Sequence, residues 1–205
     1  MTLASPHDGF RALKDQVPAF AAAMEIYGQA PLRVWPAGFG TLVKIIAGQQ
    51  LSTKAAAAIV ARLEQSLGAV EPKKLLATSP ESLREIGLSH AKIRAVHDLS
   101  QRLVDGRLDL EFLNRADDAT VTEELTQVTG IGPWTSEIYL LFALNRPDIW
   151  PAADLALAVA LQTLLGLDSR PDAAAMRHHA EGFKPWRSYA AHYLWHMYHC
   201  IKSPA

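Results

Sequence analysis

Apolar residues recur at helical spacing along almost the whole chain. The segments with this spacing begin at serine, aspartate or proline and end at glycine, as α-helices do. No segment alternates convincingly between apolar and polar residues, as a half-buried strand would. The pattern therefore predicts an all-α protein of roughly ten short helices. Eight of the predicted helices lie within residues 10–28, 41–50, 52–68, 78–87, 89–106, 116–130, 171–181 and 185–200, and two further apolar helices are predicted to begin at Pro133 and at Asp154.

Several of these boundaries carry specific capping residues. Ser52 is expected to cap a helix that stops at Gly68. Ser79 is expected to cap a helix with Pro80 at its first position, where the missing N–H costs nothing. Residues 28–40 are rich in Gly and Pro and are predicted to form a loop.

Composition narrows the class of protein. The chain has 205 residues, of which 49% are apolar and 20% charged, so a packed core is expected. The net charge of -1 excludes a protein that coats nucleic acid through its overall charge. A single cysteine, Cys200, excludes an internal disulfide and a cysteine-ligated iron–sulfur cluster. No signal peptide or membrane span is evident, so a cytoplasmic protein is expected.

The stretch Gly130-Ile131-Gly132-Pro133 separates two predicted helices. Two glycines permit a tight turn with positive φ and a close approach of another backbone. Pro133 is suited to open the second helix, whose first amides would then form an anion site. A DNA phosphate fits such a site because the contact does not depend on sequence. The alternative is a corner in which the glycines only permit close helix packing.

This stretch, followed by "RPDIWPAADLAL" at residues 146–157, resembles the signature of the helix-hairpin-helix DNA glycosylase superfamily. Within it, the chain is similar to the 3-methyladenine DNA glycosylase II branch, which acts in alkylation repair. Further similar pieces occur in the same order, so the resemblance runs from about Phe39 to about Trp195. These pieces are residues 45–56, 79–100, 105–113 and 184–195.

The resemblance implies base excision repair of DNA. Such an enzyme flips a damaged base out of the duplex and hydrolyses its N-glycosidic bond. Asp154 matches the catalytic aspartate, which would stabilise the positive charge that develops on the sugar. The alternative role of Asp154 is a helix N-cap, and the two roles are compatible. The family often has two acidic residues here, whereas this chain has Ala153 before Asp154.

The resemblance also implies hydrolysis without cleavage of the DNA backbone. Relatives with lyase activity carry a lysine just after the hairpin glycines, where this chain has Trp134. An indole cannot form the Schiff base that the lyase step requires. No cofactor is expected. The substrates implied are alkylated bases of the 3-methyladenine and 7-methylguanine class in double-stranded DNA, and the chain is expected to act as a monomer.

The base pocket is expected to be aromatic, because a ring face attracts a cationic base. Trp134 and Trp195 are the first candidates, Trp150 and Tyr139 the weaker ones, and core packing is the alternative for each. A relative has tyrosines at two further pocket positions. This chain has Ile138 and Leu155 there, which makes the pocket less aromatic.

Further residues are expected to contact DNA. The loop of residues 47–53 resembles the segment that fills the gap left by the flipped nucleotide, with Gln50 as the first candidate and Leu51 as the next. The alternative is a helix end in which Gln49 and Gln50 bond to backbone groups. The hairpin residues Gly130, Ile131, Gly132 and Thr135 are expected to lie at the phosphates. Cationic candidates are Lys54, Lys92, Arg94 and Arg187.

Two kinds of metal site come into question. The resemblance implies a monovalent cation held by the backbone carbonyls of Thr126, Val128 and Ile131 in the hairpin. Separately, three histidines and Cys200 lie close together in the last predicted helix, at positions 192, 196 and 199. They could bind zinc or copper, although one helix rarely supplies more than two ligands to a tetrahedral ion.

The resemblance predicts two helical lobes with a DNA cleft between them. Residues 1–38 are expected to pack with the C-terminal lobe, residues 39–133 to form a lobe ending in the hairpin, and residues 134–205 to carry the catalytic aspartate. The main rival is a DNA-binding module without chemistry, in which an acidic Asp154 facing phosphates has no use. A helical protein-interaction domain is the third interpretation, and it would show no salt-dependent affinity for DNA.

Overall fold

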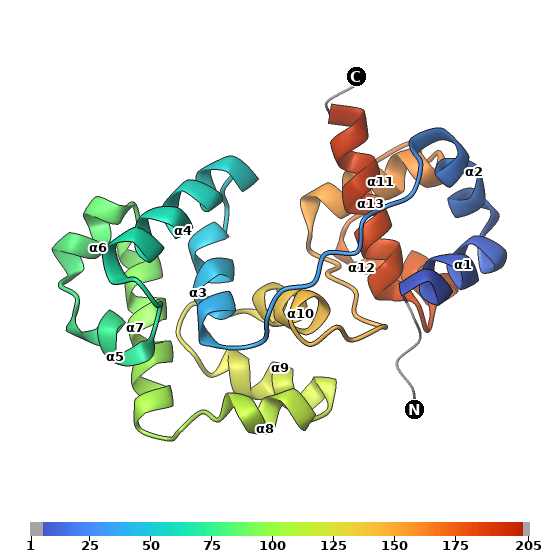
Figure 1. The fold of residues 1–205 in the computed structure, drawn as a ribbon. Coiled ribbons are helices and arrows are strands. Elements are labelled where there is room, and N and C mark those ends of the chain that lie inside the picture. Colours follow the sequence, from blue (N-terminus) through green and yellow to red (C-terminus); the bar gives the residue numbers. More distant parts are fainter. Residues whose placement is uncertain (1–5, 203–205) are drawn as a thin grey trace. The chain divides into compact units, whose positions relative to one another are not determined.

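The computed structural model describes residues 6–202, and the ends of the chain at residues 1–5 and 203–205 lie outside the described part. The described residues form thirteen α-helices and one 3₁₀ turn, without a strand (Figure 1). The predicted all-α class is confirmed. The N-terminal helices are α1 (Pro6–Gln16), α2 (Pro18–Tyr27), α3 (Phe39–Gly48), α4 (Thr53–Leu67), α5 (Pro72–Ala77), α6 (Pro80–Ile86) and α7 (His90–Val104). The remaining elements are α8 (Leu110–Arg115), α9 (Asp118–Thr126), α10 (Pro133–Phe142), α11 (Leu155–Leu165), α12 (Ala173–Ala180), η1 (Glu181–Phe183) and α13 (Arg187–Lys202).

Capping residues set the helix starts where the sequence predicted them. The Ser52 hydroxyl accepts from the Ala55 amide at the start of α4, and the Ser79 hydroxyl accepts from the Ser82 amide at the start of α6. Gly68 follows α4 with φ 65°, a conformation in which a residue with a side chain would be strained.

Three elements differ from the sequence pattern. The apolar spacing of residues 10–28 predicts one helix, but the segment forms α1 and α2, which are separated at Val17. Pro18 is the reason, because it has no N–H to continue α1 and instead occupies the first turn of α2. The short helices α5 and α8 were not predicted, because six residues are too few for a clear period.

The chain divides into two compact units: residues 1–34 with 145–205 form unit 1, and residues 35–144 form unit 2. The expected boundary at residue 133 is therefore wrong, since it would cut the helical hairpin in two. Helix α10 packs against α9 and α3 of unit 2. The expected boundary at residue 38 moves to residue 34 for a similar reason. The Trp35 amide bonds to the Phe142 carbonyl at 2.8 Å, and its ring stacks on Phe142 at 4.4 Å.

In unit 1, α13 runs through the core with α11, α1 and α2 packed against it. Its buried face includes Tyr193 and Leu194, both fully inaccessible. In unit 2, α7 packs against α5, α3 and α6. In each unit, several helices thus pack against one central helix, which gives rigid support to the turns that carry polar groups.

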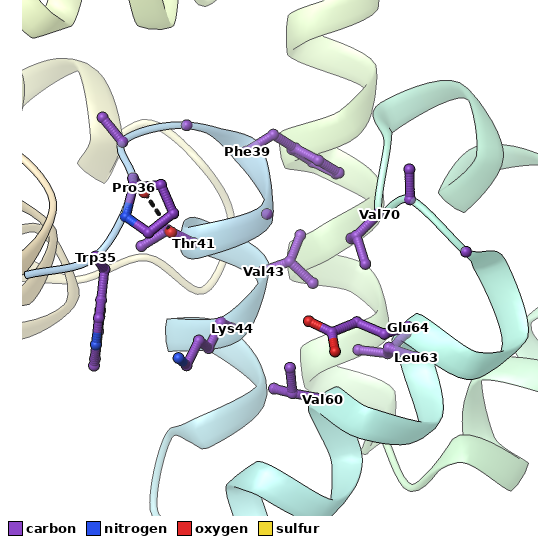
Figure 2. A pocket seen from close by; sticks show the side chains of 15 residues that line it. Trp35, Pro36, Phe39, Thr41, Val43, Lys44, Val60, Leu63, Glu64 and Val70 are labelled. Carbon is purple, nitrogen blue, oxygen red and sulfur yellow. Dashed lines mark hydrogen bonds between the residues drawn. The ribbon is translucent and has the colours of Figure 1, made fainter.

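A hollow of about 600 Å³ lies on unit 2 beside the start of α3 (Figure 2). Trp35, Lys44, Val60 and Glu64 are among its lining residues, and the Lys44 ammonium lies 4.8 Å from the centre of the Trp35 ring. The Thr41 hydroxyl donates to the Pro36 carbonyl at 2.6 Å and fixes the turn before α3. None of the site residues predicted from the sequence lines this hollow.

No helix among residues 6–202 is long and apolar enough to cross a membrane.

Candidate active site and nucleic-acid interface

The turn between α9 and α10 contains two glycines that serve different purposes. Gly130 has φ 79°, and a Cβ there would lie 2.9 Å from the Cβ of Ala95 on α7. Gly130 is therefore required by the fold. Gly132 has φ -103° and an extended conformation, so the predicted positive φ is wrong at this position. A Cβ on Gly132 would meet no atom of a more distant residue within 4 Å, so the space on that side of Gly132 is open.

Helix α10 starts without a side-chain cap. Its N-cap residue is Gly132, which has no side chain to cap the helix, and Pro133 occupies the first turn. Backbone N–H groups at a helix start carry a partial positive charge that favours an anion. Combined with the open space at Gly132, this start permits a phosphate to approach the backbone closely.

Helix α7 holds the hairpin turn from behind. The Thr129 amide donates to Oδ2 of Asp98 at 2.7 Å, and Asp98 also accepts from Arg102 at 3.0 Å. Burial raises the pKa of Asp98, but the hydrogen bonds from Thr129 and Arg102 outweigh it, so the pKa lies below its ordinary value. The carboxylate thus stays charged and fixes the turn. Sequence reasoning missed Asp98, because it lies 31 residues from its partner.

The turn between α3 and α4 exposes the two residues predicted to fill the gap in DNA. Gln50 is exposed and has φ 57°, which residues other than glycine rarely adopt. Leu51 is 42% exposed. Gln49 plays a different part, since its Nε2 donates to the Gly130 carbonyl at 3.0 Å and to the Thr135 hydroxyl at 2.9 Å. The alternative interpretation of Gln49, in which its side chain bonds to a backbone group, is therefore confirmed. The exposure of Gln50 argues against the same role for that residue.

Asp154 is the N-cap of α11. Its Oδ1 accepts the Leu157 amide at 3.0 Å and the indole N–H of Trp195 at 3.2 Å. The predicted capping role is confirmed, and both bonds lie within unit 1. A short acidic side chain with two donors on one oxygen has little rotational freedom. The structure thus presents a fixed, partly exposed carboxylate.

The model of the HhH-GPD superfamily of base excision DNA repair proteins matches residues 43–185. The chain belongs to this superfamily. A DNA-3-methyladenine glycosylase of Schizosaccharomyces pombe is 34% identical over 75% of this chain and 69% of its own, which places the chain in the alkylation-repair branch. A Bacillus subtilis relative is 28% identical over 86% of this chain and 64% of its own. The chain thus spans about two thirds of the length of these relatives.

A solved structure agrees with the sequence relatives. The 3-methyladenine DNA glycosylase of S. pombe, in complex with abasic DNA, matches with a TM-score of 0.86 and 27% identity. The match covers 96% of this chain and 98% of that one. The HhH-GPD fold predicted from the resemblance is confirmed.

The HhH-GPD base-pocket candidates divide between the units. Trp134 and Ile138 lie on α10 in unit 2, where Ile138 is 4% exposed. Trp195 and Leu155 belong to unit 1, where Leu155 is 59% exposed. Trp195 is partly exposed and also bonds to Asp154, a second role that the sequence did not indicate.

The two weaker aromatic candidates belong to the core. Trp150 is 6% exposed and donates to the Met176 carbonyl at 3.0 Å. Tyr139 is inaccessible, and its hydroxyl accepts from the Gly38 amide at 2.9 Å. Burial raises the pKa of Tyr139. Both rings therefore pack as ordinary core residues, which was the alternative interpretation.

Two of the four cationic candidates have partners inside the protein. Lys92 donates to the Ala47 carbonyl at 2.8 Å, and burial lowers its pKa. Arg187 pairs with Asp148 at 2.7 Å. Lys54 at the start of α4 and Arg94 on α7 are exposed, so both are available to phosphates.

The structure gives different results for the two possible metal sites. Among the described residues, no group of three or more His, Cys, Asp or Glu could hold a metal ion, so the histidine cluster of α13 is not such a site. His196 bonds instead to the Tyr27 carbonyl at 2.9 Å, and His192 is 6% exposed. The hairpin carbonyls of Thr126, Val128 and Ile131 remain a proposed cation site. The Val128 carbonyl accepts the Ile131 amide at 3.0 Å, which leaves a second lone pair on this oxygen.

Proposed function

We propose that this protein is a monofunctional DNA glycosylase of base excision repair, which hydrolyses the N-glycosidic bond of alkylated purines and leaves an abasic site. The way in which Asp154 is held supports this proposal most directly. The carboxylate of Asp154 is held by the Leu157 amide and the Trp195 indole at the position that matches the catalytic aspartate of the family. A fixed charge stabilises a transition state without the cost of reorganising at the moment of reaction.

The reaction needs little acid catalysis. An alkylated purine such as 7-methylguanine already carries a positive charge, so it departs as a neutral base with the electrons of the C1′–N bond. The sugar develops oxocarbenium character, which the Asp154 carboxylate stabilises. The oxygen of a water molecule then forms the new bond to C1′ and loses its proton, and the carboxylate is suited to orient this water. The products are a free base and an intact strand with an abasic sugar.

The absence of lyase chemistry is proposed from one residue. Trp134 stands in the first turn of α10, at the position where lyase relatives carry a lysine. An indole nitrogen is not nucleophilic enough to form a Schiff base with the sugar. Trp134 is partly exposed, and its ring is proposed to stack on the flipped base.

Binding to duplex DNA is proposed through a few positioned groups. The backbone at the start of α10, around Gly132, would hold a phosphate, and the exposed Lys54 would contribute charge. Gln50 and Leu51 would enter the gap that the flipped nucleotide leaves. The relative whose structure contains abasic DNA supports this mode of binding. Because few charges take part, affinity should fall with salt less steeply than for a strongly basic protein.

The function is tested on DNA treated with a methylating agent. Incubation with the purified protein should release free 3-methyladenine and 7-methylguanine, detected by chromatography of the soluble fraction. The strands should remain intact until alkali is added, and borohydride should trap no covalent complex. Release of bases together with a trapped complex would overturn the monofunctional part, and binding without any release would favour a DNA-binding module.

A further inference from the structure

Two turns of unit 2 are tied together by one side chain. Gln49, at the end of α3, donates from Nε2 to the Gly130 carbonyl at 3.0 Å and to the Thr135 hydroxyl at 2.9 Å. These partners lie 81 and 86 residues further along the chain, in the hairpin turn and in the first turn of α10. Thr135 is 3% exposed, so the second bond is shielded from water.

Helix α7 supports each of the two turns separately. Lys92 donates to the Ala47 carbonyl near the end of α3, and Asp98 accepts the Thr129 amide of the hairpin. Between these contacts, Ala95 lies against Gly130. Without Gln49, each turn would therefore still be held on α7. The bonds of Gln49 are the link that runs directly from one turn to the other.

The residue after Gln49 is in an unfavourable conformation. Gln50 has φ 57°, and its backbone is held there by neighbours: the Gln49 amide donates to the Ile46 carbonyl, and the Leu51 amide donates to the Gly48 carbonyl. Such a conformation persists where surrounding contacts over-determine it, and it often presents a functional side chain. Within the turn from Gly48 to Leu51, the side chain of Gln49 bonds directly to the hairpin, so it sets where Gln50 is presented.

We infer that Gln49 is a positioning residue that couples the phosphate-holding hairpin to the loop that fills the gap in DNA. It acts through Gln50 and the hairpin and contacts no substrate itself. When a phosphate binds at the start of α10, the tie keeps Gln50 at a fixed distance from that phosphate. This inference rests on the proposed function, since it assumes that the same protein surface binds a duplex with a displaced nucleotide.

The test uses the variant Gln49→Leu, which keeps the side-chain size and removes the donor. The control is Gln101→Leu, the same change at an exposed glutamine of α7 that bonds only locally to Asp105 at 2.8 Å. The DNA is a duplex with a tetrahydrofuran abasic analogue opposite 2-aminopurine. Filling of the gap beside the orphaned base changes the 2-aminopurine fluorescence, and a titration of the same signal and of anisotropy gives the dissociation constant.

Gln49→Leu is expected to change the 2-aminopurine fluorescence much more than the dissociation constant. Gln49→Leu should bind with a dissociation constant within about threefold of wild type, because α7 still holds the hairpin, while the fluorescence change at saturation falls to about half or less. Gln101→Leu should match wild type in both. A full fluorescence change in Gln49→Leu would overturn the inference, as would a weaker affinity with an unchanged fluorescence amplitude at saturation.

A second variant guards against a folding defect. Thr135→Val removes one of the two bonds of Gln49 with almost no change in shape, and it should lower the fluorescence amplitude in the same direction. If Gln49→Leu does not fold, this variant decides. The readout involves no bond cleavage. A wild-type protein that binds this duplex and changes its fluorescence, yet releases no base from methylated DNA, would fail the proposed function and leave the inference standing.

Discussion

Helix α10 begins at Pro133 and helix α11 begins at Leu155, and the first turns of these two helices are equipped in opposite ways. Helix α10 starts at Gly132, which provides no side-chain cap, and the space where a Cβ of that residue would lie is open. Helix α11 starts at Asp154, whose own carboxylate occupies the cap and bonds to Leu157 and Trp195. The first start is available to an anion from outside, and the second presents an anion to its surroundings. A phosphate and a developing sugar cation are the two charges that such a pair suits.

The largest effect is expected from removing the charge at α11. Asp154→Asn keeps the cap, because the amide oxygen still accepts both hydrogen bonds. Single-turnover base release should fall about 10³-fold, the scale seen when one transition-state charge contact is lost. The control is Asp172→Asn, at an exposed aspartate that caps α12 in the same unit. Equal rates of base release for the two variants would mean that Asp154 takes no part in the reaction.

Burial of His192 makes the stability of the protein depend on pH. Burial, and after it the charge of Arg33, lower the pKa of His192 to about 4, and its ring lies 6.3 Å from that of Trp195. Because the unfolded chain binds the proton near pH 6.5 and the folded one does not, this stability is present above pH 6.5. It is lost between pH 6.5 and 4, by up to about 3 kcal/mol.

Urea unfolding at several pH values measures this loss. His192→Gln should show a shallower fall in the free energy of unfolding across this window, whatever its stability at neutral pH. His199→Gln, at an exposed residue of the same helix, should keep the wild-type slope. A wild-type slope in His192→Gln would mean that another group takes up the proton.

The two hairpin glycines should separate stability from binding. Gly130→Ala introduces a left-handed alanine and a contact with Ala95, so unfolding should become easier by about 2 kcal/mol. Gly132→Ala fits without a clash and should stay within about 1 kcal/mol of wild type. It should nevertheless weaken binding of undamaged duplex about tenfold, by blocking one charged hydrogen bond. Thermal unfolding measures the stability of both variants, and anisotropy titration measures their binding to DNA. Unchanged binding in Gly132→Ala would mean that Gly132 does not contact a phosphate.

The smallest effect concerns the second donor to Asp154. Trp195→Phe keeps a ring for stacking and removes the indole N–H, so base release should slow about tenfold while binding of abasic DNA is unchanged. Trp150→Phe also loses an indole hydrogen bond in unit 1, to Met176, and should lose stability but not rate. If weaker binding of abasic DNA accounts for the whole loss of rate in Trp195→Phe, then Trp195 acts by stacking and not through its bond to Asp154.

Local features were predictable from the sequence, and long-range ones were not. The caps at Ser52, Ser79 and Asp154 each bond to the amide three positions further along the chain, so a sequence pattern reveals them. The bonds of Gln49 and Asp98 join turns that are distant in the chain, and only the packing of α7 brings their partners within reach.

Some sequence-based predictions were wrong because residues of the same type occupy different surroundings in the structure. Two glycines in one turn look equivalent as letters, but only Gly130 has a positive φ, and Gly132 is distinguished by the space around it. Trp150 and Trp195 are equally aromatic, and burial alone assigns the first to the core. The boundary at residue 133 failed because Pro133 marks a helix start, and a helix start need not be the start of a unit.

The proposed function depends on hydrolytic release of alkylated bases from a strand that stays intact. A single-turnover reaction of wild type with three duplexes that hold one 7-methylguanine, one ethenoadenine or one hypoxanthine measures this release. Free 7-methylguanine is expected at the fastest rate, because only this base departs from a cationic state, and the strand is expected to break only after alkali. Binding of all three duplexes with no free base from any would contradict the proposed function and leave a non-catalytic DNA-binding module as the better description.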